Sequence, residues 1–268
     1  APAQRGKALS TTFLGMSMSY VIGVPLGAWL GLAYGWRLPQ LLVLITLVLM
    51  MVLVWRLMPP DVDAPGASFQ GLGALLRRSE VLRTLVMTLL YFTAIFGVFS
   101  YIGPVLQALV PLSPGALSIT LVIFGLAGVA GTLSGGWAND RFGPLPSLRV
   151  QLSGLMLMML LLPLTQGWYL PMLLTLVAWG VCGFGMMAPQ QARLASASPA
   201  HAPLLLSLNT SMLYFGTALG AAVGGGASHA LGFARLPWIS AAFALAGLLI
   251  LLTSPRANAP APVRMTQI

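Results

Sequence analysis

Charged residues and cysteine are both scarce in this chain. Only 6% of its 268 residues are charged, against roughly 25% in soluble domains, and the single cysteine, Cys182, excludes an intrachain disulfide framework. The four acids, Asp61, Asp63, Asp140 and Glu80, are predicted to lie in loops, and neither histidine has another metal-ligating residue type close to it in the sequence. The sequence therefore predicts no enzyme, no metal site and no cofactor.

What the chain has instead is long apolar segments. Hydrophobic residues make up 58% of the sequence, and the mean hydropathy is +0.91. Six uncharged stretches hold 18 to 56 residues each. One helical membrane span needs about 20 residues, so the two longest stretches must each fold back once. This predicts an all-α polytopic membrane protein with eight transmembrane helices, at residues 9–34, 39–57, 81–108, 114–136, 148–166, 168–192, 204–229 and 236–253.

The order of the basic residues along the chain predicts its orientation. The net charge is +9, but the basic residues are scattered between apolar runs instead of forming a patch, so no nucleic-acid partner is expected. With the first residues in the cytoplasm, only Arg37 and Arg235 of the 13 Lys and Arg residues fall outside. By the positive-inside rule, both termini are expected in the cytoplasm.

An internal repeat divides the chain. Three glycines four residues apart strip one face of a helix of side chains, which predicts close packing against another helix. The first copy, in "GVPLGAWLG", contains Gly23, Pro25, Gly27 and Gly31, and the second, in "GTALGAAVG", contains Gly216, Gly220 and Gly224. We expect two helices of a first bundle (1–58), a cytoplasmic linker with a short amphipathic run (59–80), a six-helix bundle (81–253) and a tail (254–268).

Three segments carry a family resemblance: "RGKALSTTFLGMSMSYVIGVPLGAWLGLAYGWR", "FSYIGPVLQALVPLSPGALSITLVIFGLAGVAGTLSGGWANDRFG" and "LNTSMLYFGTALGAAVGG". They resemble helix five, helices seven and eight, and helix eleven of the major facilitator superfamily, in its drug:proton antiporter and sugar-efflux branch of bacterial inner membranes. The resemblance implies a twelve-helix fold of two bundles, of which this sequence covers helices five to twelve as a fragment. It also implies alternating access and efflux, with proton coupling through an acid in the first or fourth helix, which this sequence lacks.

One loop matches a motif of that family, G-x-x-x-D-R-x-G, through Gly136, Asp140, Arg141 and Gly143. In the family this loop is thought to latch the two bundles in one access state. Gly143 suits a tight turn with positive φ, Asp140 is expected to accept backbone N–H groups, and Arg141 to bind carbonyls at a helix end. Pro144 and Pro146 stand where basic residues usually follow, and the alternative is a plain turn with one interfacial arginine.

The resemblance also implies that helices seven and ten line a central cavity. The candidate substrate contacts on these two helices and on helix eleven are Tyr91, Phe92, Phe96, Phe99, Ser100, Tyr101, Trp179, Met186, Gln190, Asn209 and Tyr214. An apolar aromatic pocket with a few amide and hydroxyl groups suits a small neutral, drug-like or sugar-like solute. The alternatives are packing or lipid contact for these side chains, with an uncoupled facilitator or a non-transporting receptor or scaffold as the function.

Overall fold

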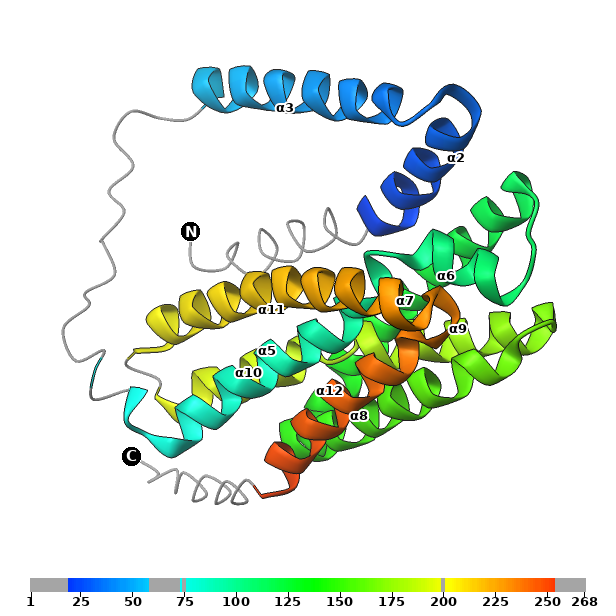
Figure 1. Cartoon of the computed structure of the whole chain (residues 1–268). Coiled ribbons are helices and arrows are strands. Elements are labelled where there is room, and N and C mark those ends of the chain that lie inside the picture. Colours follow the sequence, from blue (N-terminus) through cyan, green and yellow to red (C-terminus); the bar gives the residue numbers. More distant parts are fainter. Residues whose placement is uncertain (1–18, 58–72, 74–75, 199–200, 254–268) are drawn as a thin grey trace, which may run out of the picture.

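The computed structural model describes residues 19–57, 73, 76–198 and 201–253, and every regular element among them is a helix (Figure 1). The segments 9–18, 59–72 and 254–268 of the predicted first helix, linker and tail lie outside the described residues. A π-helical turn, η2 (Ser19–Gly23), precedes α2 (Val24–Tyr34) and α3 (Arg37–Leu57). The remaining elements are α5 (Ser79–Phe99), α6 (Ile102–Leu109), α7 (Pro114–Phe142), α8 (Pro144–Leu161), η3 (Leu162–Thr165), α9 (Tyr169–Phe184), α10 (Met187–Ala197), α11 (Ala202–Leu231), η5 (Phe233–Arg235) and α12 (Leu236–Leu252).

Seven helical segments in the described part of the chain are long and apolar enough to cross a membrane. They are 37–57, 79–99, 114–142, 144–165, 169–197, 202–231 and 233–252. They agree with the predicted second to eighth spans in place and order, because the length of an apolar run is read directly from the sequence. The chain is therefore an all-α multi-pass membrane protein, while the eighth span stays a prediction.

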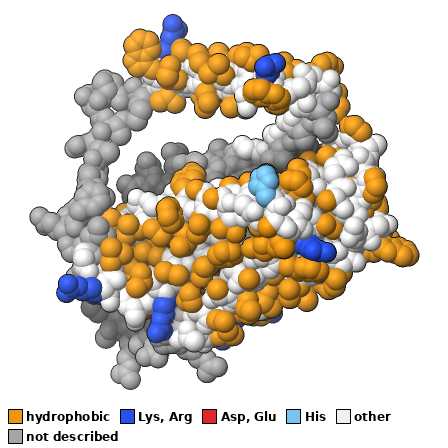
Figure 2. Space-filling model, viewed as in Figure 1, with side chains coloured by type: hydrophobic (Ala, Val, Ile, Leu, Met, Phe, Trp, Pro, Cys, Tyr) orange, Lys and Arg blue, Asp and Glu red, His pale blue; other side chains and the backbone are white. Residues whose placement is uncertain are grey.

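Helices α5 to α12 form a bundle, and α2 with α3 projects from one end of it (Figure 1). Helix α5 packs along both α11 and α12, and α9 packs between α7 and α8. The largest buried side chains of the bundle include Tyr91, Ile95 and Trp179. Helix α2 contacts α7, whereas α3 has no buried residue and stands apart from the bundle. The apolar side chains of α3 therefore lie on the surface, as do many of the bundle (Figure 2).

Two predicted spans are interrupted. We expected a continuous helix over 81–108 with a bend at Gly103, but α5 ends at Phe99 and α6 begins at Ile102, so the break lies at Ser100 and Tyr101. The span expected over 168–192 breaks at Gly185 and Met186, between α9 and α10. Gly185 allows a neighbouring backbone to approach closely, since a Cβ there would lie 2.8 Å from the Gly131 carbonyl oxygen.

Helix ends also differ from expectation. Helix α7 continues to Phe142, so Gly136, Asp140 and Arg141 are helical and do not lie in a loop. Glu80 likewise lies in the first turn of α5. Both ends carry charged side chains, which an apolar-run criterion removes from the span although the helix continues through them.

The second copy of the glycine repeat lies at a close helix contact. A Cβ on Gly220 would lie 2.7 Å from the Thr93 carbonyl oxygen, and Cβ atoms on Gly216 and Gly224 would meet α5 as closely. Side-chain-free surface lets the backbones of α5 and α11 approach within a distance that any other residue would prevent. The first copy differs, because Cβ atoms on Gly23 and Gly27 would meet nothing within 4 Å, and one on Gly31 only Pro39 at 3.8 Å. Pro25 lies in the first turn of α2.

Candidate functional site

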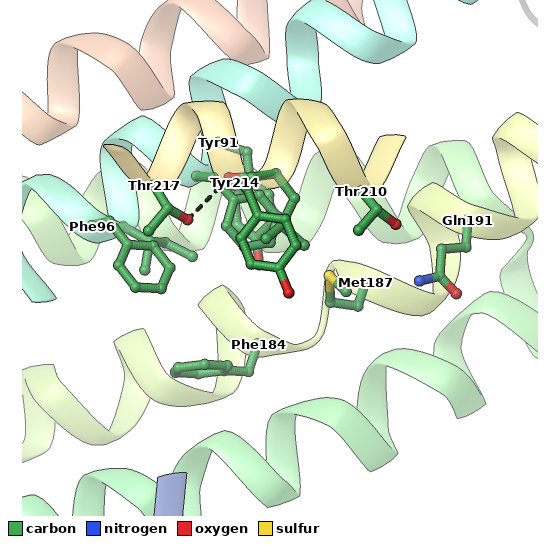
Figure 3. Close-up of a pocket in the computed structure, with 11 residues that line it drawn as sticks. Tyr91, Phe96, Phe184, Met187, Gln191, Thr210, Tyr214 and Thr217 are labelled. Carbon is green, nitrogen blue, oxygen red and sulfur yellow. Dashed lines mark hydrogen bonds between the residues drawn. The ribbon is translucent and has the colours of Figure 1, made fainter. Parts of the chain in front are cut away.

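A pocket of about 410 Å³ opens between α5, α9, α10 and α11 (Figure 3). Its lining has no charged side chain; it combines aromatic and aliphatic groups with hydroxyls and one amide. The lining residues are Tyr91, Phe92, Ile95, Phe96, Phe184, Met187, Gln191, Thr210, Leu213, Tyr214 and Thr217. This volume lies within the range of small-molecule sites, and a mostly apolar wall with a few polar groups is their usual composition.

Helix α5 supplies a fixed aromatic wall. The rings of Tyr91 and Phe92 meet edge to face at 4.7 Å between centroids, and those of Phe92 and Phe96 stack at 6.1 Å. The Tyr91 hydroxyl donates a hydrogen bond to the carbonyl oxygen of Gly183 on α9, which ties this wall to the opposite helix. Such aromatic contacts hold the rings in place before any ligand arrives.

Helix α11 supplies the most polar side of the pocket. Thr210, Leu213, Tyr214 and Thr217 follow one another at spacings of three and four residues or fewer, so they lie on one helix face. The Tyr214 side chain is 66% exposed, so its ring is the most accessible of the predicted contacts. Figure 3 shows this ring beside Met187 of α10.

The α9–α10 side of the pocket is lined by a different face from the one that the sequence suggested. We expected the stripe of Trp179, Met186 and Gln190, but all three are at least 97% buried and none lines the pocket. The lining side chains Phe184, Met187 and Gln191 form a neighbouring stripe, with Met187 and Gln191 each one residue further along the chain than Met186 and Gln190. A hydrophobic stripe marks the face of a helix that is buried, and only the neighbouring helices decide whether a cavity borders that face.

Four of the eleven predicted contacts therefore line the pocket, namely Tyr91, Phe92, Phe96 and Tyr214, and seven do not. The Phe99 ring packs against Phe124 of α7 at 6.1 Å. Ser100 is exposed at the end of α5, and the Tyr101 hydroxyl donates to the carbonyl oxygen of Ala221, 2.8 Å away. Whether any of these residues contacts a solute stays a prediction.

The sequence missed Ile95, Phe184, Met187, Thr210, Leu213 and Thr217, and Gln191 was considered only as a gate. Helical spacing from Tyr214 selects its neighbours on α11, and spacing from Tyr91 selects Ile95.

A buried amide network lies next to the pocket and joins α5, α10 and α11. The Gln190 amide nitrogen donates to the Thr84 carbonyl oxygen at 2.8 Å and to the Thr88 hydroxyl at 2.7 Å. The Thr88 hydroxyl in turn lies 2.6 Å from Asn209 Oδ1, which accepts its proton. Gln190 Oε1 is buried and has no hydrogen-bond partner among the described residues. This network positions the predicted contacts Gln190 and Asn209 as links between helices.

The loop motif occupies the end of α7. Gly143 has φ +82° at the turn into α8, as the tight turn requires, and its N–H bonds to the Asn139 carbonyl oxygen. Asp140 Oδ1 accepts from the Asn139 side-chain amide at 3.3 Å, and the described residues include no backbone N–H bonded to it. The Arg141 guanidinium lies 5.8 Å from the Trp137 ring centroid, in a cation–π contact instead of the expected bond to carbonyls.

No group of three or more His, Cys, Asp or Glu residues that suits a metal ion occurs among the residues that the structure describes. The pocket chemistry is thus that of hydroxyl, amide and aromatic contacts, which bind and orient a neutral molecule.

The comparisons with known proteins agree with this architecture. The chain is 31% identical over 258 residues to "Inner membrane transport protein YdhP" of Escherichia coli (strain K12), covering 94% of this chain and 65% of that protein. It is 26% identical over 238 residues to "Probable sugar efflux transporter" of Mannheimia succiniciproducens, covering 89% of this chain and 60% of that protein. The chain thus spans less than two thirds of the length of these relatives.

A solved structure shares the fold. The Escherichia coli fucose:proton symporter FucP superposes with a TM-score of 0.63 at 19% identity, over 84% of this chain and 58% of that one. The family model described as Major Facilitator Superfamily matches residues 1–202, which is most of the chain. The chain therefore belongs to the Major Facilitator Superfamily of membrane transporters.

Proposed function

We propose that the protein exports a small neutral solute, sugar-like or drug-like, which binds in the pocket between α5, α10 and α11. The observation that carries this proposal is the composition of the pocket, whose aromatic rings, hydroxyls and amide include no charged group. A charged solute entering this site would lose its hydration without gaining a counter-ion, whereas a neutral solute needs only apolar contact and a few hydrogen bonds. The relative described as a sugar efflux transporter supports export as the direction.

The resemblance of the repeats supports alternating access as the mechanism. In transporters built from repeated bundles, one bundle rocks against the other around a site near the bilayer midplane. Helix α2 contacts α7, and this contact joins the first part of the chain to the second bundle. The loop motif at Gly136, Asp140, Arg141 and Gly143 adjoins the α7 end of this arrangement, and we propose that it favours one access state.

Proton coupling is part of the proposal, and it depends on an acid that the described residues do not supply. Glu80 and Asp140, the two acids that the structure describes, lie in the first turn and near the last residue of their helices, away from the middle of the membrane. A coupling group has to change its charge while it faces a cavity. We propose that the coupling acid lies in a helix equivalent to the first or fourth of the family.

Tracer flux tests the proposal. Inside-out vesicles from cells that express the protein are incubated with labelled neutral sugars, neutral drug-like solutes and drug-like cations in turn, with and without a proton gradient. Accumulation of a neutral solute that requires the gradient supports coupled export, and equilibration without the gradient supports an uncoupled facilitator. Absence of flux and of binding for every solute would contradict transport and favour a receptor or scaffold.

The pocket itself is tested by a matched pair of variants on α11. Tyr214→Ala removes a ring that lines the pocket, whereas Phe215→Ala removes a neighbouring ring of similar exposure (61% against 66%) that does not line it. We expect Tyr214→Ala to lower solute affinity about 5- to 100-fold, as one lost aromatic contact costs about 1–3 kcal/mol. Equal flux and affinity in the two variants would contradict the assignment of the pocket.

We further propose an inner-membrane location with both termini in the cytoplasm. The test uses a variant in which Cys182 is replaced by alanine and one new cysteine stands at position 140. An impermeant thiol reagent should label it from the cytoplasmic side only, and labelling from outside would overturn the orientation.

A further inference from the structure

A second hollow lies on the outer surface of the bundle, where α11 ends and α12 begins. It is an open groove of about 560 Å³, and its lining residues are Leu231, Arg235, Trp238, Ile239, Ala242 and Phe243. It shares no residue with the pocket between α5, α10 and α11. A site on the outside of a membrane-spanning bundle faces lipid.

The groove runs along the axis of α12. Arg235, Trp238, Ile239 and Ala242 are spaced as i, i+3, i+4 and i+7, so they share one face of the helix. From Arg235 to Phe243 the helix rises about 12 Å, which is most of the roughly 15 Å hydrocarbon depth of one leaflet. The arginine lies at the end of the span and the apolar side chains follow it inward. This is the polarity of a phospholipid, which has its phosphate at the interface and its acyl chain along the membrane normal.

The positive charge of Arg235 has no acid near it among the described residues. The Arg83 guanidinium donates to the Thr253 carbonyl oxygen at 3.1 Å, which places the start of α5 beside the end of α12. Glu80, in the first turn of α5, is therefore at the opposite end of α12 from Arg235.

Asp140 is also distant from the groove. It lies next to the turn at Gly143, where α8 begins, whereas Trp238 donates its indole N–H to the Leu160 carbonyl oxygen near the end of α8, at 3.1 Å. The whole length of α8 thus separates this acid from the groove. The same hydrogen bond holds the Trp238 ring as a fixed wall and leaves Arg235 as the polar group that can meet a headgroup.

We propose that this groove binds an anionic phospholipid, with the phosphate on the Arg235 guanidinium and one acyl chain along Ile239, Ala242 and Phe243. The lining selects against zwitterionic headgroups, because a headgroup ammonium would find no carboxylate among the described residues at this end of the bundle. An anionic headgroup such as that of phosphatidylglycerol brings no such unmatched positive charge. This inference concerns the lipid surface and does not depend on which solute the protein carries.

Native mass spectrometry of the detergent-purified protein tests the charge. The protein is titrated with phosphatidylglycerol, and the retained lipid is counted for the wild type, Arg235→Gln and Arg37→Gln. Arg37 is the matched control, since it precedes Leu38 and Pro39 as Arg235 precedes Leu236 and Pro237, but its guanidinium lies over the Trp36 ring at 5.1 Å. One arginine–lipid contact near the surface predicts about five-fold weaker retention in Arg235→Gln and no change in Arg37→Gln.

A second pair of variants tests the apolar part of the groove. Ala242→Phe fills the groove, whereas Leu245→Phe changes another exposed position of α12 that does not line it. We expect Ala242→Phe alone to release phosphatidylglycerol, while phosphatidylethanolamine and inorganic phosphate show no dependence on Arg235 in any variant. Equal retention in all variants would overturn the proposal, because it would mean that Arg235 merely extends to the interface without holding a lipid. Equal dependence of inorganic phosphate and phospholipid on Arg235 would also overturn it.

Discussion

The glycine contact between α5 and α11 leads to the most direct prediction. Alanine at position 220 would place its Cβ 2.7 Å from the Thr93 carbonyl oxygen and 2.9 Å from the Gly97 nitrogen, against ordinary contact distances that begin at 3.4 Å. Both neighbours are backbone atoms, so the strain cannot be relieved by rotating a side chain, and the helices must separate. Overpacking of this kind typically costs about 1–3 kcal/mol.

The internal repeat supplies the control for this variant. Gly27 is the counterpart of Gly220 in the first copy, and a Cβ there would meet nothing within 4 Å. Both substitutions gain about 0.5–1 kcal/mol from replacing glycine by alanine within a helix. Because that gain is common to both, Gly220→Ala should be less stable than Gly27→Ala by about 1–3 kcal/mol.

The assay is unfolding of the purified protein in mixed micelles, by titration with a denaturing detergent, followed by tryptophan fluorescence. The expected result is an earlier midpoint for Gly220→Ala than for Gly27→Ala, with the wild type as the reference. Equal midpoints would refute the reasoning, since they would mean that α5 and α11 separate without cost or do not touch at this glycine.

Three further predictions follow from the turn, the amide network and the loop motif. Gly143→Ala should lower stability by about 1–2 kcal/mol, because φ is +82° there, whereas Gly136→Ala, at a helical position with open space, should not; the same unfolding assay compares them. Thr88→Val should cost about 0.6–1.7 kcal/mol by removing the hydroxyl that links α5 to α10 and α11. Thr46→Val on α3 serves as its control, since that exposed hydroxyl bonds only to its own helix, and equal losses would argue against the network. Asp140→Asn should slow solute flux in vesicles without reducing the amount of protein in the membrane, and full flux would remove the proposed latch.

Much of the fold was predictable because apolar run length is a local property. The ends of α3, α11 and α12 lie within two residues of the predicted limits, since charged or turn-forming residues mark them. The glycine spacing likewise predicted a close helix contact, and the second copy has one. The breaks at Ser100 and Gly185 were not predicted, because both lie inside uncharged stretches whose composition does not change there.

The candidate pocket was predictable only in part. Tyr91 and Tyr214 were expected on helical spacing and aromatic character, and they line it. Trp179 has the same character, but its ring packs against Phe124 at 4.8 Å between centroids and is 1% exposed. Aromatic residues favour both cavities and cores in membrane helices, so residue type alone does not separate the two.

The sequence by itself determined that this chain is a bundle of membrane-spanning helices with a repeated architecture, because hydrophobic length and glycine spacing act along one helix at a time. Only the tertiary structure decided how far each helix turns about its axis, and hence that Met187 and Gln191 face the pocket while Met186 and Gln190 are buried. That rotation is set by contacts between helices far apart in sequence, and a one-residue difference moves a side chain by about 100° around the helix. The same reason explains the glycines: identical spacing gives a tight interface at Gly220, where α5 is present, and an open face at Gly27, where no described helix packs.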